Sequence, residues 1–135
     1  MGVDQYHEPP AELSAETRTF ARLSASLTEE SEAIGWYAQR LALESDPEAR
    51  AIMRDAQGEE FKHFCMDLEF LLRKTPVWRE IAQGILFQAG NIVEHGEAAE
   101  AAAEGGGSHG PAGGTDRSPD GSVSLGIGSL KERLA

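Results

Sequence analysis

The dipeptide Asp46-Pro47 most constrains the fold of this chain, because it separates two long segments that both have a helical pattern. Aspartate is a favoured helix N-cap and proline is favoured at the first helical position, so the pair ends one helix and starts another. Thr75-Pro76 repeats this signal. We therefore expect a first helix entered near Pro9-Pro10 or Ser14, a second over about 47–74, and a shorter third in VWREIAQGILF.

Apolar residues recur in steps of three and four along both long segments, which is typical of helices packed on one face. The first seam contains Phe20, Leu23, Leu27, Ile34, Tyr37 and Leu41, and Glu30 occupies the position between Leu27 and Ile34. The second seam reads Met53, Ala56, Glu60, His63, Asp67 and Phe70, with a neighbouring stripe of Phe61, Phe64, Leu68 and Leu71 or Leu72. Polar side chains thus interrupt both seams.

A tight turn near Ser45-Asp46 predicts that Glu30, Glu60 and His63 meet. Antiparallel helices joined by a short turn bring residues at equal distance from the turn side by side. Glu30 lies 16 residues before Asp46 (46 − 30) and Glu60 lies 14 after it (60 − 46). At about 1.5 Å per residue both are roughly 21–24 Å from the turn. His63 shares the helix face of Glu60 because the two are three residues apart.

Two carboxylates buried together would cost several kcal/mol each, unless a cation compensates their charge. Carboxylate and imidazole ligands together suit iron, manganese or zinc better than calcium. One glutamate with a Glu-x-x-His pair is half of the ligand set of di-iron four-helix bundles. The sequence contains no second copy of this half ligand set and no internal repeat. We therefore expect two chains to pair, each supplying Glu30, Glu60 and His63, in an obligate oligomer built from dimers.

Composition excludes several functional classes. The chain has 12 Lys and Arg against 23 Asp and Glu, a formal net charge of −11, which disfavours nucleic-acid binding because that needs a basic surface. No apolar run reaches the roughly 20 residues of a membrane span, and the polar N-terminus does not read as a secretory signal. The one cysteine, Cys65, fits a reducing compartment, and we expect it to be a small buried apolar residue. A cytoplasmic protein is the expectation.

The C-terminal part of the chain changes in character. Residues 97–121 are rich in Gly, Ala, Ser and Pro with almost no large apolar residues, so we predict a disordered linker after a helical domain at 1–96. The last residues, 122–135, become apolar again. An apolar patch at the end of a flexible linker is suited to docking, with weak binding of each copy multiplied by avidity.

Four stretches together resemble the encapsulated ferritins, the ferritin-like cargo proteins of encapsulin nanocompartments. They are EESEAIGWYAQR at 29–40, SDPEA at 45–49, GEEFKH at 58–63 and SLGIGSLK at 124–131. The resemblance implies an all-α hairpin that completes a ferritin-like four-helix bundle on dimerisation, and a ring of five dimers. It implies ferroxidase activity, with Glu30, Glu60 and His63 holding two irons between chains and Glu60 bridging them. The shell, not the ring, would store the mineral.

The same resemblance implies further roles. Trp36 and Tyr37 would lie close to the iron site, and Glu29 and Glu32 would form a weaker approach site for incoming metal. Leu125, Ile127 and Leu130 would dock on the inner wall of the encapsulin shell. Asp55 stands where some relatives have histidine, which removes support for an accessory metal position there.

Plainer interpretations remain beside these. Trp36 and Tyr37 also fit simple packing, and Glu29 and Glu32 fit a solvated acidic face. Asp67 lies a turn beyond His63 and fits a structural or exposed role. The whole chain could be a non-catalytic metal-binding or scaffold module in which metal only locks the dimer, or a helical adaptor for a shell.

Overall fold

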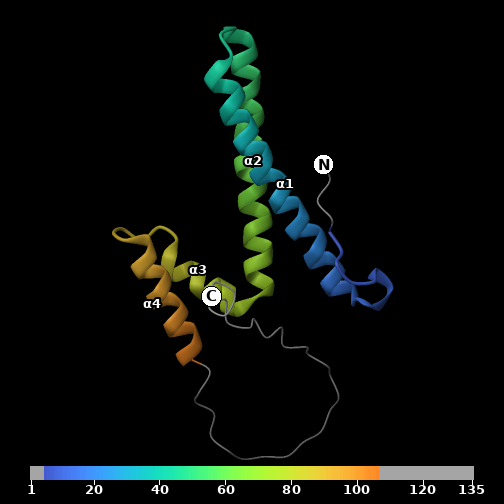
Figure 1. Ribbon diagram of the computed structural model, residues 1–135, viewed down its shortest axis with the longest axis vertical. Coiled ribbons are helices and arrows are strands. Elements are labelled where there is room, and N and C mark those ends of the chain that lie inside the picture. The colour runs from blue at the N-terminus through green and yellow to red at the C-terminus, as the bar shows by residue number, and fades with distance from the viewer. Residues whose placement is uncertain (1–4, 107–135) are drawn as a thin grey trace, which may run out of the picture.

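The computed structural model describes residues 5–106, and every regular element in this part of the chain is a helix (Figure 1). A short 3-10 helix, η1 (Pro10–Glu12), precedes α1 (Ala15–Leu43), α2 (Pro47–Lys74), α3 (Pro76–Ile85) and α4 (Ile92–Gly105). The all-α class expected from the sequence is confirmed. None of these helices is both long and apolar enough to cross a membrane.

Helices α1 and α2 form an antiparallel hairpin whose ends are capped by their own side chains. The Ser14 hydroxyl accepts from the Thr17 amide at 3.1 Å, and the Asp46 carboxylate accepts from the Ala49 amide at 2.9 Å. Arg50 donates to the carbonyl of Glu44 at 2.7 Å and also to that of Leu41. These carbonyls at the end of α1 would otherwise lack partners. The predicted signal at 46–47 therefore ends one helix and starts the next.

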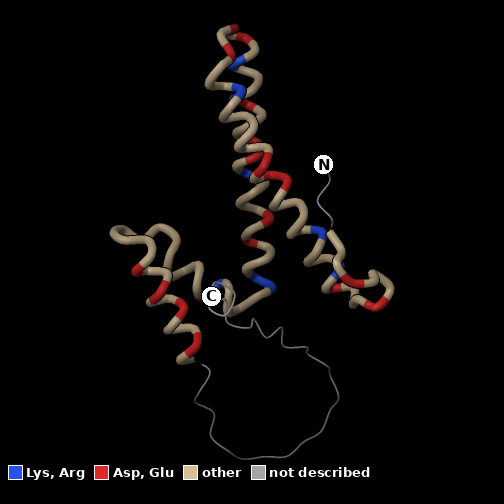
Figure 2. Tube along the Cα trace, viewed as in Figure 1, with Lys and Arg blue, Asp and Glu red and all other residues tan. Residues whose placement is uncertain are grey.

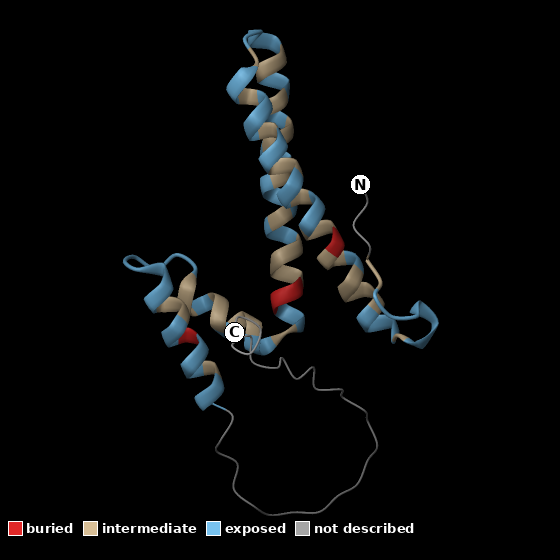
Figure 3. Ribbon diagram, viewed as in Figure 1, coloured by how far each residue is buried: buried red, intermediate tan, exposed pale blue. Residues whose placement is uncertain are grey.

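The two predicted seams face each other along the hairpin. All seven α1 positions in the pattern, Glu30 included, are half-buried, and so are the α2 positions except His63. Half-burial means that each seam is only partly covered by the opposite helix, and Figure 3 shows intermediate and exposed residues along most of both helices. Toward its N-terminus α1 diverges from α2 (Figure 1). The hairpin is thus half of a bundle by its geometry.

Very little hydrocarbon is fully buried within the single chain. Among residues 5–106 the buried hydrophobic residues are Ala25, Leu71, Leu72 and Ala99. Within this same range ten large hydrophobic residues are exposed, among them Ile52, Phe61 and Met66 on α2. Isolated soluble domains rarely expose contiguous apolar surface on this scale. Residues 5–106 of the single chain therefore enclose only a small apolar core.

Two side chains that were expected to be buried are exposed. Phe61 was assigned to the widened apolar stripe and is 51% exposed, and Cys65, expected to be buried, is exposed as well. Both lie on α2, which contacts α1 along one side only and α3 near its end. A helix with so few neighbours leaves the rest of its surface to solvent within a single chain.

Helices α3 and α4 form a second, smaller hairpin at the end of α2 far from the 44–46 turn (Figure 1). Arg79 of α3 is bonded at 3.0 Å to Glu69 of α2, which also binds Arg73. Gly84 allows α3 and α4 to approach closely, because a Cβ at this position would lie 2.6 Å from the Cβ of Ala99. The small side chains therefore set the spacing of this hairpin.

The linker prediction is wrong for residues 97–105, which continue α4. The Asn91 side chain caps this helix by accepting from the amides of Val93 and Glu94 at 2.9 and 3.3 Å. Alanine has the highest helix propensity, and its short side chain suits the close contact with α3. The lack of large apolar residues, used to predict disorder, was therefore misleading here. Residues 107–135, with Leu125, Ile127 and Leu130, lie outside the described residues.

Candidate metal centre

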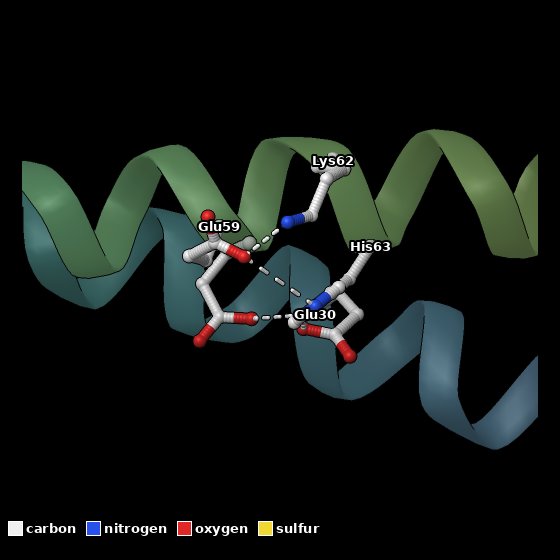
Figure 4. Close-up of polar contacts among 5 residues, drawn as sticks. Glu30, Glu59, Lys62 and His63 are labelled. Carbon is white, nitrogen blue, oxygen red and sulfur yellow. Dashed lines mark hydrogen bonds and ion pairs between the residues drawn. The ribbon is translucent and has the colours of Figure 1, made fainter.

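Glu30 of α1 and Glu60 and His63 of α2 come together midway along the hairpin. Each residue offers one ligand atom, and the three atoms lie within 4.8 Å of one another. His63 Nδ1 is 3.6 Å from Glu60 Oε2 and 4.0 Å from Glu30 Oε2. Figure 4 shows Glu30 and His63 reaching from opposite helices into the same space. The meeting expected from equal distances to the turn is therefore present in the structure.

A hydrogen bond one turn away fixes the register that produces this meeting. The Gln57 amide donates to the backbone carbonyl of Ile34 at 3.1 Å. Ile34 lies four residues after Glu30, and Gln57 lies three before Glu60. A slide of α1 along α2 would break this bond between a side chain and the backbone.

The carboxyl group of Glu30 lies against that of Glu60 in a partly covered position. Their side chains are only 21% and 23% exposed. The pKa of Glu30 is raised to about 7, first by a hydrogen bond with Glu60 and then by burial and by the charge of Glu60. His63 opposes this rise and Asp67 adds to it. The carboxyl group of Glu30 is therefore partly protonated near neutral pH, and a bound cation would favour its ionised form.

This raised pKa predicts how the stability of the metal-free protein depends on pH. The unfolded carboxyl titrates near 4.5 and the folded one near 7, so between these values the folded state binds more protons. Stability should therefore be greatest at the acidic end and fall as pH rises from 4.5 to 7. Urea unfolding in EDTA, at fixed protein concentration, checks this. Glu30→Gln should lose this part of the slope and be more stable than wild type at pH 8.

The donor set fits a transition-metal ion. Carboxylate and imidazole are ligands of iron, manganese and zinc. Ligand distances of about 2.0–2.2 Å place two ligands of one ion at most about 4.4 Å apart. The observed spread of up to 4.8 Å can therefore close by small side-chain rotations. Three protein ligands leave coordination positions open for a second set of residues or for a small molecule.

Glu59 also contacts this cluster, and the sequence analysis did not single it out. Its carboxylate lies 3.9 Å from Nε2 of His63 and forms an ion pair with Lys62 (Figure 4). The spacing of four residues between Glu59 and His63 was a usable signal, because such residues are neighbours on a helix. It was missed because Glu59 does not belong to the apolar seam.

The remaining predicted site residues lie around the triad without bonding to it. Glu29 and Glu32 are exposed on α1. Trp36 is 51% exposed, and the half-buried Tyr37 has the Arg40 guanidinium 5.3 Å from its ring centre. Within residues 5–106, no hydrogen bond or ion pair links either aromatic residue to Glu30, Glu60 or His63.

Two aspartates of α2 differ in their relation to the cluster. Asp67 is half-buried and its charge contributes to the raised pKa of Glu30. It therefore belongs to the electrostatic surroundings of the triad. Asp55 is exposed and does not belong to the group of ligand atoms.

Comparisons with known proteins agree with this architecture. The family model described as EncFtn-like matches residues 5–89. A "Ferritin-like protein" of Thermotoga maritima is 42% identical over 92 residues, which cover 68% of this chain and 81% of the relative. An "Encapsulated ferritin-like protein" of Rhodospirillum rubrum is 42% identical over 129 residues, which cover 96% of this chain and 89% of the relative.

A solved structure shows the same fold. The crystal structure of a protein from Nitrosomonas europaea superposes with a TM-score of 0.64 at 39% identity, covering 66% of this chain and 98% of that one. Together with the family match over more than half of the residues, these similarities settle the family. The chain belongs to the EncFtn-like family of ferritin-like proteins.

Proposed function

We propose that this protein is a ferroxidase that oxidises Fe(II) to Fe(III) at a di-iron centre formed between two subunits. The single observation that carries the proposal is the cluster of Glu30, Glu60 and His63 at the open side of a two-helix half-bundle. Half of a di-iron ligand set in a ferritin-like chain is completed when a second copy supplies the same three residues.

Dimerisation is supported by what the single chain leaves uncovered. Both seams are half-buried, and large apolar side chains of α1 and α2 remain exposed. A second hairpin packed on the open side would cover the seams and place its own triad opposite the first. An isologous pair of this kind gives two equivalent iron positions. Assembly of dimers into a ring-shaped decamer belongs to the same proposal.

The residues of the triad would bind the substrate ions. The positive charge of these ions would remove the repulsion between the carboxylates of Glu30 and Glu60. Two Fe(II) ions give up two electrons in all, which with two protons reduce one dioxygen to hydrogen peroxide, or one peroxide to two waters. Glu30 would release its proton as iron binds, and the carboxylates of Glu30 and Glu60 would then neutralise ionic charge. Glu60 would bridge the two ions, as the resemblance to encapsulated ferritins implies.

Acidic residues near the triad would assist the approach of Fe(II). Glu29 and Glu32 are exposed beside Glu30 on α1, and acidic side chains recur along both long helices (Figure 2). Exposed carboxylates raise the local concentration of cations and bind them weakly. Trp36 and Tyr37 would border the path that leads from these glutamates to the iron.

The C-terminal segment would bring the protein into an encapsulin shell in the cytoplasm. The Rhodospirillum rubrum relative matches 129 of the 135 residues, so the matched stretch reaches at least residue 129. It therefore includes Leu125 and Ile127 of the proposed docking segment 122–135. Iron oxidised at the ring would then be stored inside the shell.

The experiment that tests the proposal uses the purified full chain. We expect anaerobic titration to saturate at one Fe(II) per chain in a dimeric or larger species, with oxidation and oxygen consumption when air is admitted. A crystal of the iron-bound protein should show two anomalous scatterers between two chains at the iron edge. Binding without oxidation would instead establish a metal that only locks the dimer, and absence of bound metal would leave a helical adaptor.

A further inference from the structure

We propose that the α3–α4 hairpin is an arm whose tip docks into a groove on α2 of a second copy of this chain. The arm tip carries four exposed apolar side chains, those of Leu86, Phe87, Ile92 and Val93. The inference rests on the further assembly of dimers, which is part of the proposed function, and it does not depend on iron oxidation. Neither the arm tip nor the groove includes a residue of the metal-binding triad.

The arm tip is an apolar cluster that the rest of the chain leaves uncovered. Phe87 is fully exposed, Ile92 and Val93 are 71% and 68% exposed, and Leu86 is 42% exposed. In Figure 1 the loop that joins α3 and α4 lies at the end of the arm, away from α2. Burial of apolar surface drives most protein association, and exposed apolar patches mark interaction sites. The arm tip therefore has the composition of a docking surface.

Phe87 is held in an unfavourable backbone conformation by the loop around it. Its φ is 62°, in the left-handed region that bulky residues rarely adopt. The side-chain amide of Gln88 donates to the carbonyl of Gln83 at 3.3 Å. Nε2 of His95 donates to the carbonyl of Ala89 at 2.7 Å. Strain of this kind is found mainly at functional positions, and a loop that is already ordered loses less entropy on binding.

The groove lies on a face of α2 that remains open in the single chain. Its volume is about 520 Å³, and the residues that line it are Lys62, Cys65, Met66, Glu69, Phe70 and Arg73. Their spacing of three and four places them on one helix face. Met66 is 61% exposed and Cys65 is exposed, so the apolar middle of the groove is accessible. Phenylalanine and methionine are enriched at the centres of protein interfaces, so Phe87 suits this groove.

The charges around the two surfaces are opposite. Residues 86–106 contain no lysine or arginine, and α4 carries Glu94, Glu97, Glu100 and Glu104. Residues 69–79 carry Arg73, Lys74 and Arg79 against one carboxylate, Glu69, which Arg73 and Arg79 share. Figure 2 shows acidic positions along α4 and basic positions where α2 meets α3. Complementary charge of this kind steers association and selects the partner.

A second copy is the partner that satisfies both surfaces at once. The arm tip and the groove are both exposed in the same chain, so they do not cover each other. When the arm of one copy enters the groove of another, the apolar side chains of both are buried and the acidic α4 approaches the basic end of α2. Copies can exchange arms in pairs or each pass the arm to the next, and either arrangement links dimers into a larger assembly.

The first test uses Cys65, the one cysteine of the chain, as a reporter inside the groove. Phe87→Cys adds a thiol at the arm tip of the full chain, and a short bismaleimide should then join positions 65 and 87. Mass spectrometry of mixed nitrogen-15-labelled and unlabelled chains should show that the link joins two copies. Leu43→Cys, at an 89% exposed position beside the 44–46 turn, is the matched control and should give no link to Cys65. Equal linking in both variants, or links within one chain alone, would overturn the proposal.

The second test measures what the aromatic ring contributes to assembly. Phe87→Gly preserves the loop, because glycine adopts a positive φ without strain, and it removes the ring. Sedimentation velocity should show dimers in place of larger species, with the helix content and the Fe(II) oxidation rate per chain unchanged. Assemblies of wild-type size would overturn the proposal, including the case in which shell loading alone is lost and the arm tip is thereby assigned to the shell. Links between positions 65 and 87 in a protein that oxidises no iron would support the arm and overturn the ferroxidase.

Discussion

Replacing Glu60 or His63 with alanine should reduce the initial rate of Fe(II) oxidation on the order of 100-fold or more. Loss of a residue that only supports a metal ligand commonly costs about 10–100-fold, and loss of the ligand itself should cost at least as much. Each substitution acts twice in a symmetric dimer, because both iron positions lose a donor. The absorbance of Fe(III) and oxygen consumption under stopped-flow conditions measure the rate.

Two control variants make this result interpretable. Asp55→Ala removes an exposed carboxylate of α2 outside the cluster and should leave the rate unchanged. Glu32→Ala removes an exposed carboxylate near the cluster and should slow oxidation at low iron without changing the number of ions bound at saturation. Equal rates in wild type, Glu60→Ala and His63→Ala would eliminate the ferroxidase.

Deletion of residues 122–135 should abolish co-purification with a co-expressed encapsulin shell and leave Fe(II) oxidation at the wild-type rate. The deleted segment contains Leu125, Ile127 and Leu130, the apolar residues proposed to dock on the shell. Each copy would bind weakly, and a ring would multiply the binding through many copies. Quantifying the cargo in purified shells by denaturing electrophoresis measures the loss.

Two further variants separate the docking residues from the linker. A triple substitution of Leu125, Ile127 and Leu130 with alanine should reproduce the deletion, because chain length is kept and only apolar contact is removed. Removal of residues 109–115 should preserve loading, since the remaining linker still joins the same two parts. Undiminished co-purification of the deletion variant would refute the role of the segment.

The hairpin could be predicted from the sequence because its signals are local. Asp46-Pro47 sets the turn through a cap and a fixed backbone angle, and α2 extends from Pro47 to Lys74 as expected. The meeting of Glu30, Glu60 and His63 follows from helical rise and equal distance to that turn. No long-range information was needed for this part of the site.

The sequence-based predictions were wrong where contacts between helices determine whether a residue is helical or buried. Residues 97–105 are helical because Asn91 caps α4 and Gly84 accommodates Ala99, a contact between helices that composition does not reveal. Within residues 5–106, α2 packs on α1 and, near its end, on α3, and these contacts leave Cys65 exposed. Glu59 was overlooked because it lies outside the apolar seam, although its spacing of four residues from His63 was a usable signal.

The small buried core has a consequence for how the protein behaves on dilution. Residues 5–106 bury only a few hydrophobic side chains within one subunit, so in the proposed dimer folding and association would be one equilibrium, and the measured stability would depend on protein concentration. Dilution would then dissociate the subunits and unfold them. Confinement in a closed volume would do the opposite, keeping copies crowded together and therefore folded.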